Sequence, residues 1–375
     1  MVRKVPVDFL LPGMVTGTAI YNDDGHVLLA SGVTLTVSYI RRLHEMGFPS
    51  VVIDDEITEG IIVADVIKES TRVQALKQIK ETFLLFKEKT SHEKMNVVKL
   101  NDLVEDIIEQ ITNNNDIICN LSEIRSVDNY LYAHSVNVCV LSIMTGLSLG
   151  YNHYKLNELA IGALLHDIGK ARIPYEILNK PGELTKEEFE LIKKHPAYSL
   201  EILKDNCSVS SIARMVAYRH HEKFNGEGYP EGIEGSKFFE EAQIVGMVDI
   251  YDAIVSDRCY RKGMPPNEAY EYISGSGDFY FSYYLVKHFL AQVAAYPVGS
   301  FVRLSTEEIA LVVETHKYCS LTPKVRILFH PDFSPVAEPK EIDLYQSTGK
   351  SITKVFTETE ISNLLMKNKL PFNAV

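Results

Sequence analysis

The strongest constraint on the fold is a helical spacing of apolar residues that begins near residue 60. From there to residue 120, apolar side chains recur every three, four or seven positions, a spacing that places them on one face of a helix. The first series comprises Ile62, Val66, Val73, Leu76, Ile79, Phe83 and Phe86, and the second Val97, Leu100, Val104, Ile107, Ile111 and Ile118. We expect two amphipathic helices joined by the polar segment 89–96.

The pattern leaves the partner of these two helices open. They can pack together as a hairpin within the chain, or they can form a homodimer or relay a signal. Residues 121–295 also look helical almost throughout. Within them, Thr185 and Glu188 have the spacing of a capping box, which predicts the start of a helix before Phe189.

Both ends of the chain have the pattern of short strands. In residues 1–60, apolar runs at 16–21, 27–29 and 51–54 accompany the turn signal Asn-Asp-Asp-Gly at 22–25 and a short helix over 37–46 that ends at Gly47. Residues 296–375 contain strand-like runs at 302–304, 309–313 and 325–329. We therefore predict a mostly α protein, with a helical bundle core and small β-rich N-terminal and C-terminal elements.

Composition narrows the possible partners and compartment. The net charge of -12 over 375 residues argues against binding of a nucleic acid polymer. A small anionic ligand is compatible with it, because a few local cations dominate within a screening length of ~8 Å. Five scattered cysteines without a C-x-x-C pair indicate a reducing compartment. Since there is no signal-peptide pattern and no apolar run of about 18 residues, we expect a cytoplasmic protein without membrane insertion.

Histidine and aspartate residues occur in unusual company within the helical segment. They are the adjacent pairs His166-Asp167 and His220-His221, together with His134, His195 and Asp249, which lies three residues before Asp252. Imidazole and carboxylate without thiolate are ligands typical of Fe, Mn, Zn or Ni rather than of a structural zinc site. Each of these residues alone is more often an ordinary packed or exposed side chain, and their joint occurrence indicates a metal centre. A pair of metals can activate water and bind the oxygens of a phosphodiester.

These residues lie in five ordered motifs. The motifs are His134-Ser135-Val136-Asn137-Val138, His166-Asp167-Ile168-Gly169-Lys170, His195-Pro196, His220-His221-Glu222 followed by Asn225-Gly226 and Gly228-Tyr229-Pro230, and Asp249-Ile250-Tyr251-Asp252-Ala253. Over roughly residues 120–305 the chain resembles the HD-GYP domain, a branch of the HD metal-dependent phosphohydrolases. The resemblance implies an HD-type helical bundle at residues 121–305. Around it we expect a small β-rich domain at 1–60, a helical linker at 61–120 and a β-rich extension at 306–375.

The resemblance also implies a set of metal ligands. His134, His166, Asp167 and Asp249 would surround one divalent metal, and Asp167 would bridge to a second metal held by His195, His220 and His221. Iron and manganese are the metals that this family implies. Tyr130 stands one helical turn before His134, where three-metal members carry a carboxylate, so we expect two metals.

The activity implied by the resemblance is that of a phosphoric diester hydrolase that cleaves cyclic di-GMP to pGpG and/or GMP. Asp167 and Lys170 would be catalytic, with Lys170 also contacting a phosphate. Arg258 and Arg261 would reach the other phosphate, and Tyr229 would contact a guanine. The competing interpretations are a helix cap for Lys170, ordinary surface arginines, and a purely structural turn at Tyr229.

Two other functions remain open at this point. The protein could be a receptor that binds cyclic di-GMP with slow or no hydrolysis, or a phosphodiesterase for another cyclic dinucleotide such as cyclic GMP-AMP. Four positions depart from the residues frequent in the family and bear on substrate preference. They are Ser199, Asn225, Gln243 and Cys259.

Overall fold

The computed structural model describes residues 2–21, 27–48, 50–54, 61, 65–87, 95–114, 118–119, 130–180, 182–206, 208–256, 263–347 and 349–367. The chain divides into two compact units. One is built from the two ends of the chain, mainly residues 1–65 and 294–375, and the other from residues 66–121 and 130–293. The second unit is helical and contains all seven predicted metal ligands.

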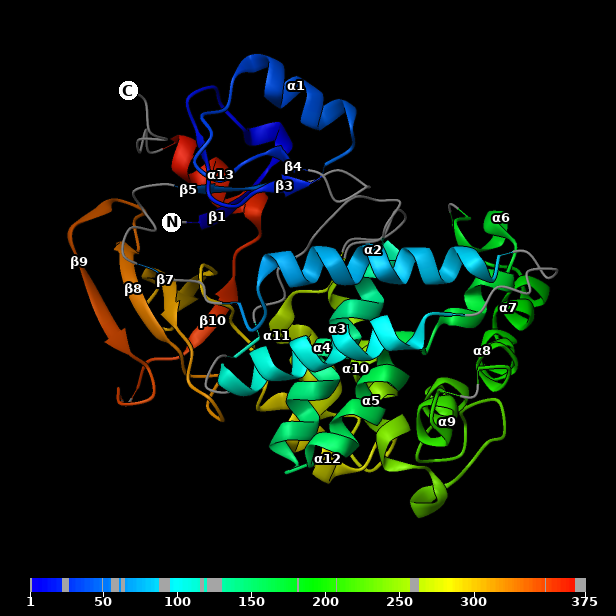
Figure 1. Ribbon diagram of the computed structural model, residues 1–375. Coiled ribbons are helices and arrows are strands. Elements are labelled where there is room, and N and C mark those ends of the chain that lie inside the picture. The colour runs from blue at the N-terminus through cyan, green and yellow to red at the C-terminus, as the bar shows by residue number, and fades with distance from the viewer. Residues whose placement is uncertain are drawn as a thin grey trace. The chain divides into compact units, whose positions relative to one another are not determined.

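The helical unit confirms the expected mostly α architecture (Figure 1). Its elements are α2 (Glu69–Leu85), α3 (Val97–Asn113), α4 (Tyr130–Ser148), α5 (His153–Leu165), the 3₁₀ helix η4 (Ile168–Arg172), α6 (Tyr175–Leu178), α7 (Lys186–Ile192), α8 (His195–Lys204), α9 (Ser211–Arg219), the 3₁₀ helix η5 (Gly235–Lys237), α10 (Glu240–Val255), α11 (Pro266–Ser274) and α12 (Tyr283–Leu290). The predicted capping box is present at the start of α7, where Thr185 and Glu188 cap each other's backbone N–H groups.

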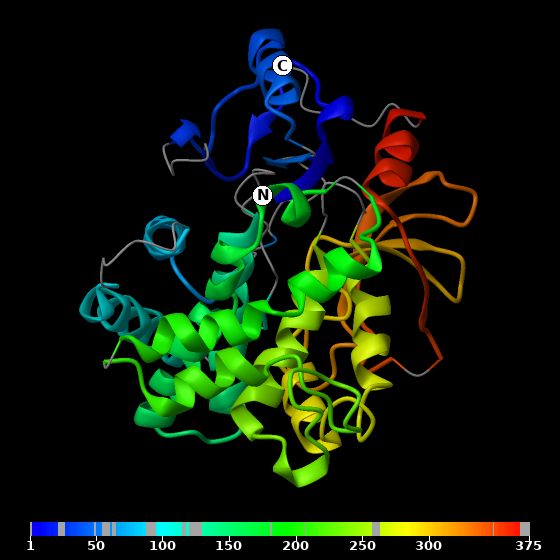
Figure 2. The same cartoon turned by 90° about the vertical axis from the view of Figure 1, so that its right-hand side faces the viewer.

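The two predicted amphipathic helices, α2 and α3, pack within the chain. Figures 1 and 2 show them side by side on one side of the helical unit, and both contact α4. Their buried apolar residues, among them Ile79, Phe83, Leu103 and Ile107, belong to the same hydrophobic core as α4 and α5. Burial against the bundle therefore supplies the partner that the sequence pattern left open.

Helix α4 is the most apolar part of this core. By length and hydropathy, the window Leu131–Ser148 could cross a membrane, and it is the one such window among the described residues. Of that window, 67% is buried inside the structure. The central helix of a bundle has this composition because it is covered by neighbours on all sides.

The N-terminal part of the other unit contains the expected strands and short helix. Strands β1 (Val2–Pro6), β5 (Ser50–Asp54) and β2 (Val15–Thr16) form an antiparallel sheet in that order, and β3 (Ile20–Tyr21) pairs with β4 (Val27–Leu29). Helix α1 (Val37–Glu45) ends just before Gly47, whose φ of 73° suits a glycine after a helix. The predicted turn at 22–25 lies outside the described residues.

The C-terminal part is a five-stranded antiparallel sheet of order β10–β6–β7–β8–β9. The strands are β6 (Phe301–Leu304), β7 (Ile309–Glu314), β8 (Lys324–Phe329), β9 (Pro335–Asp343) and β10 (Ile352–Val355), followed by α13 (Glu358–Lys367). Alternate residues of β6 and β7 enter two different cores, one shared with Ile361 and Leu365 of α13. Because both faces are buried, β7 reads as a continuous apolar run.

Candidate metal centre

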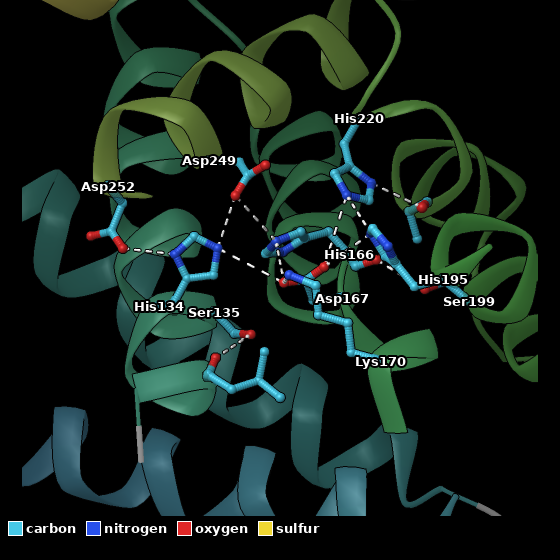
Figure 3. Close-up of polar contacts among 12 residues, drawn as sticks. His134, Ser135, His166, Asp167, Lys170, His195, Ser199, His220, Asp249 and Asp252 are labelled. Carbon is cyan, nitrogen blue, oxygen red and sulfur yellow. Dashed lines mark hydrogen bonds and ion pairs between the residues drawn. The ribbon is translucent and has the colours of Figure 1, made fainter. Parts of the chain in front are cut away.

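The seven residues predicted as metal ligands come from five parts of the helical unit and converge. Figure 3 labels all of them except His221. His134 lies in the middle of α4, and Asp249 lies in α10. His166 and Asp167 stand where α5 passes into η4, His195 is the first residue of α8, and His220 and His221 directly follow α9. All seven side chains are buried except that of His221, which is 23% exposed.

The carboxylate of Asp167 faces two groups of imidazoles with its two oxygens. Its Oδ2 lies 3.3 Å from His166 Nε2 and 3.9 Å from His134 Nε2. Its Oδ1 lies 3.2 Å from His195 Nε2 and 3.9 Å from His220 Nε2. This is the arrangement required of a carboxylate that bridges two metals.

Asp249 also faces both groups. Its Oδ1 lies 2.9 Å from His134 Nε2 and 4.0 Å from His166 Nε2, in agreement with the first ligand set. Its Oδ2 lies 3.8 Å from His221 Nδ1, which belongs to the second set. The family resemblance assigned Asp249 to the first ligand set alone. The structure adds its proximity to His221 of the second set.

Three of the imidazoles are oriented by the same type of hydrogen bond to the local backbone. The Nδ1 atoms of His166, His195 and His220 each hydrogen-bond the carbonyl oxygen three residues earlier, at 2.7, 2.7 and 3.0 Å. A carbonyl oxygen only accepts hydrogen bonds, so each Nδ1 carries the proton. Each Nε2 therefore keeps its lone pair for the centre of the site.

Two buried atoms of the centre have no hydrogen-bond partner within the described residues. They are His166 Nε2 and Asp167 Oδ1. Buried polar atoms are normally satisfied, and a metal ion at each side of Asp167 would satisfy both. The donors gather in two groups whose ligand atoms lie within 4.8 Å of one another, His134 with His166 and Asp167, and His195 with His220 and His221. The residues present thus fit a two-metal site.

The pKa values in the second group, His195, His220 and His221, favour the binding of a cation. Burial lowers the pKa of His195 to about 3 and that of His221 to about 4, and it holds the pKa of His220 well below its usual value. Burial would raise the pKa of Asp167, but the charge of Lys170 and the contact with His166 hold it well below its ordinary range. Neutral imidazoles beside an ionised carboxylate are the protonation states that a metal needs.

In the first group, the pKa of His134 is shifted in the opposite direction, because this residue lies between two carboxylates. Its Nδ1 lies 2.7 Å from Asp252 Oδ2, opposite the contact of its Nε2 with Asp249. Burial lowers the pKa of His134, but the hydrogen bonds to Asp249 and Asp252 outweigh it and raise that pKa to about 9. Sequence reasoning placed Asp252 on the face of Asp249 but assigned it no role; its three-residue spacing from a ligand was the available signal.

Close backbone contacts hold the ligand-bearing segments against one another. A Cβ on Gly169 would lie 2.0 Å from the carbonyl oxygen of His195, and one on Gly246 would lie 2.2 Å from that of His220. The hydroxyl of Ser199 accepts from the Gly169 N–H and donates to the His166 carbonyl, at 2.9 and 3.0 Å. Ser199, one of the four departures, thus ties α8 to the His166-Asp167 segment.

The loop after the histidine pair is anchored by Glu222. Its buried carboxylate accepts hydrogen bonds from the backbone N–H groups of Glu231 and Ile233, at 2.6 and 2.9 Å. The loop places the Tyr229 ring on His221, with ring centroids 4.7 Å apart and an interplanar angle of 30°. Lys193, which sequence reasoning did not single out, has its Nζ 5.8 Å from the centroid of the Tyr229 ring.

Of the three predicted phosphate-binding cations, the structure describes Lys170. Its Nζ lies 2.5 Å from Asp167 Oδ2, and its side chain is 22% exposed. Lys170 is therefore an ion-pair partner of the bridging carboxylate at the edge of the centre. Arg258 and Arg261 lie outside the described residues, as does Cys259.

Two protein families match the chain. The family described as HD domain matches residues 102–281, a range that begins within α3. The family described as KOW domain associated with HD domain matches residues 301–364, which span the five-stranded sheet.

Several curated proteins are similar to this chain. A cyclic di-GMP phosphodiesterase of Pseudomonas aeruginosa is 34% identical over 65% of this chain and 59% of its own length. The cyclic di-GMP phosphodiesterase PdeB of Borreliella burgdorferi is 31% identical over 64% and 63%. A 3'3'-cGAMP-specific phosphodiesterase of Vibrio cholerae is 37% identical over 37% and 30%. The chain thus spans less than two thirds of the length of these relatives. Residues 102–281 thus match the HD domain family, in agreement with the HD-GYP resemblance of the five motifs, and residues 301–364 match the KOW domain associated with it.

Proposed function

We propose that the protein is a metal-dependent phosphodiesterase that hydrolyses cyclic di-GMP to pGpG and/or GMP. The observation that carries this proposal is the geometry of Asp167, whose two oxygens face separate imidazole groups. The HD-GYP motifs and the similarity to curated cyclic di-GMP phosphodiesterases support the same substrate.

Two divalent metals, iron or manganese, complete the proposed site. His134, His166, Asp167 and Asp249 would hold the first, and Asp167, His195, His220 and His221 the second. When bound, the metals supply Lewis acidity toward the phosphate oxygens and activate the water that attacks phosphorus. The imidazole and carboxylate donors, without thiolate, suit iron or manganese, and the family resemblance favours these two metals over zinc and nickel.

The remaining residues bind the substrate and move protons. Lys170, already oriented by Asp167, would contact a phosphate oxygen or donate a proton to the leaving oxygen. Tyr229 covers His221 and would contact a guanine from that position. Arg258 and Arg261 would bind the second phosphate, so that local cations offset the net charge of -12.

The test is a turnover assay with metal analysis on the same sample. The protein is loaded with Fe(II) or Mn(II) under reducing conditions and incubated with cyclic di-GMP, and the products are separated by chromatography. We expect pGpG and/or GMP, with an H195Q variant inactive and an H153Q variant, at an exposed histidine, fully active. The absence of products from the fully loaded protein would contradict the proposal.

A receptor role is the first alternative, because a site with intact ligands can still be slow. Equilibrium binding of cyclic di-GMP to the metal-loaded protein distinguishes the two functions. Tight binding without product would favour a receptor. Binding accompanied by product would favour the enzyme.

Another cyclic dinucleotide is the second alternative, and a specific observation favours it. The Vibrio cholerae relative, 37% identical over its matched region, carries a name specific for 3'3'-cGAMP. Cyclic di-GMP and cyclic GMP-AMP presented together in one assay would show which is consumed faster. Faster loss of cyclic GMP-AMP would reassign the substrate.

The regions outside residues 121–305 are proposed to regulate the site or to bind partners. A homodimer through residues 61–120 would use apolar side chains that remain exposed on α2 and α3, such as Leu84 and Val98. Light scattering of the purified protein measures this directly, and a monomer at micromolar concentration would contradict it. Free thiols at Cys139 and Cys319 support a reducing, cytoplasmic location.

A further inference from the structure

A line of hydrogen bonds connects the metal centre to helix α2, which precedes the matched HD domain. His134 Nδ1 bonds Asp252 Oδ2 at 2.7 Å, the pair drawn in Figure 3. The other oxygen of Asp252 accepts a hydrogen bond from Asn137 Nδ2 at 3.0 Å. The carbonyl oxygen of Asn137 accepts from Arg72 Nη1 at 3.1 Å, and Arg72 lies on α2.

This line is built into the helices that carry two of the ligands. In α4, Asn137 follows His134 by three residues, and in α10, Asp252 follows Asp249 by three, so each pair shares one helix face. The contact of His134 with Asp249 and that of Asn137 with Asp252 therefore form neighbouring links between the same two helices. A displacement of the second link is transmitted to the first.

The donors and acceptors along the line have a single consistent polarity. An ionised Asp252 only accepts, so Asn137 must turn its amide N–H toward it. The amide oxygen of Asn137 then faces away, toward Arg72, which only donates. At the other end, Asp252 holds a proton on His134 Nδ1 and leaves Nε2 for the metal.

Arg72 is nearly completely buried, with 4% of its surface exposed. A buried guanidinium needs hydrogen-bond acceptors, and the Asn137 amide oxygen is one of them, so this contact constrains where α2 can lie. The preceding residue, Thr71, faces elsewhere: its hydroxyl donates to Asp106 of α3 at 3.0 Å. One turn of α2 thus contacts α3 through Thr71. Through Arg72 it contacts the line of hydrogen bonds that leads to His134.

We propose that Arg72 is a positioning residue for the metal centre. Through Asn137 and Asp252 it holds the imidazole of His134 in the orientation that binds the first metal. The placement of α2 thereby sets the affinity of that metal subsite while leaving the His195–His220–His221 subsite unaffected. This inference rests on the proposed two-metal site and adds a route by which a region outside the HD domain match regulates it.

The experiment measures the affinity of the metal-free protein for Mn(II) at each subsite by calorimetric titration. An R72M variant keeps the length and apolar stem of the side chain but donates no hydrogen bond. Since partners hydrogen-bonded directly to a metal ligand are worth about 10–100-fold, and Arg72 is two residues further away, we expect R72M to bind the first metal up to about tenfold more weakly and the second metal as the parent does. The matched control is T71V, which loses the two part-buried hydrogen bonds of the Thr71 hydroxyl with Asp106 and Gln110 in the same helix turn and should bind both metals normally.

Two further measurements keep the proposal testable if R72M folds poorly. R72K retains a donor and should lose less affinity than R72M; a larger loss in R72K would contradict the proposal. In an N137A background the line is already broken, so R72M should have no additional effect on metal affinity. An equal effect of R72M in both backgrounds would show that Arg72 does not act through Asn137.

The outcomes separate this inference from the proposed function. A parent protein that binds no metal would overturn both. If the parent and R72M both bind two metals with the same affinities, the inference alone fails. If T71V weakens the first metal as much as R72M does, general packing of α2 is responsible and Arg72 has no specific role.

Discussion

At the residue scale, the metal centre is organised by partners that hold each donor atom in place. Three histidines donate from Nδ1 to a carbonyl three residues earlier, and His134 bonds Asp252 instead. The sequence motifs were sufficient to predict which residues converge. They were insufficient to predict that Asp249 faces both imidazole groups or that Glu222 anchors a loop, because these depend on side-chain directions set by packing.

Asp167 faces both imidazole groups, so we expect its replacement to have the largest effect of any single change at the site. Changing Asp167 to Asn keeps its shape but removes the charge that attracts both metals. We expect metal content to fall at both subsites and turnover to drop by at least ~100-fold, since even partners behind a ligand cost about 10–100-fold. Elemental analysis with a turnover assay measures this, and Asp205→Asn at an exposed position is the control. Full metal content in the Asp167 variant would disprove the bridging role.

The two subsites should respond differently to pH. In the metal-free protein His134 has a pKa of about 9, so below pH 9 a metal must displace its proton. Affinity at the first subsite should therefore rise roughly tenfold per pH unit up to pH 9. His195 and His221, with pKa values of about 3 and 4, are already neutral, so the second subsite should be insensitive to pH above 5. Metal titrations at pH 6, 7, 8 and 9 test this, and two parallel pH profiles would contradict it.

At the scale of elements, the site is assembled by backbone contacts between short segments. Gly169 in η4 and Gly246 in α10 each lie against the carbonyl oxygen of a predicted metal-ligating histidine. Gln243, another departure from the family pattern, donates to the Phe238 carbonyl and accepts from the Ser282 N–H, at 2.8 and 3.0 Å. It therefore links the start of α10 to the segment before α12, a structural role that the sequence did not reveal.

A side chain at Gly169 should separate η4 from α8. In Gly169→Ala the Cβ would lie 2.0 Å from the His195 carbonyl oxygen, so the backbone must shift. We expect a loss of about 1–3 kcal/mol or more in the free energy of unfolding, together with weaker metal binding. Urea unfolding measures the loss. In the control Gly275→Ala, where the nearest atom is 3.6 Å away, stability should change by no more than ~0.5 kcal/mol. Equal stability of both variants would contradict the packing argument.

At the scale of the whole molecule, the helical unit includes more of the chain than the family motifs cover. The expected linker at 61–120 supplies α2 and α3, whose apolar faces are buried in the bundle core. The two β-rich ends of the chain belong to a separate compact unit. All seven predicted metal ligands belong to the helical unit, so we expect the site to form without the β-rich unit.

Deletion of α2 and α3 should unfold the helical unit. Each fully buried large apolar side chain contributes about 1.5–3 kcal/mol, and a domain is stable by only about 5–15 kcal/mol. The two helices bury several such residues, including Phe83, Leu103 and Ile107. We expect a fragment 66–293 to fold and bind metals, and a fragment 121–293 to remain unfolded. Circular dichroism and metal content of both fragments test this, and a folded shorter fragment would refute it.

The sequence by itself determined the helical core, the β-rich ends and the residues that gather at the metal centre. Apolar periodicity and ordered motifs are local in the chain, so they can be read without knowing the fold. Only the tertiary structure decided that α2 and α3 pack on the bundle, that both oxygens of Asp167 and of Asp249 are directed to different imidazoles, and that Arg72 lies behind His134. These features join residues far apart in the chain, such as His134 and Asp252 at 118 positions, and their contacts depend on how side chains pack in three dimensions.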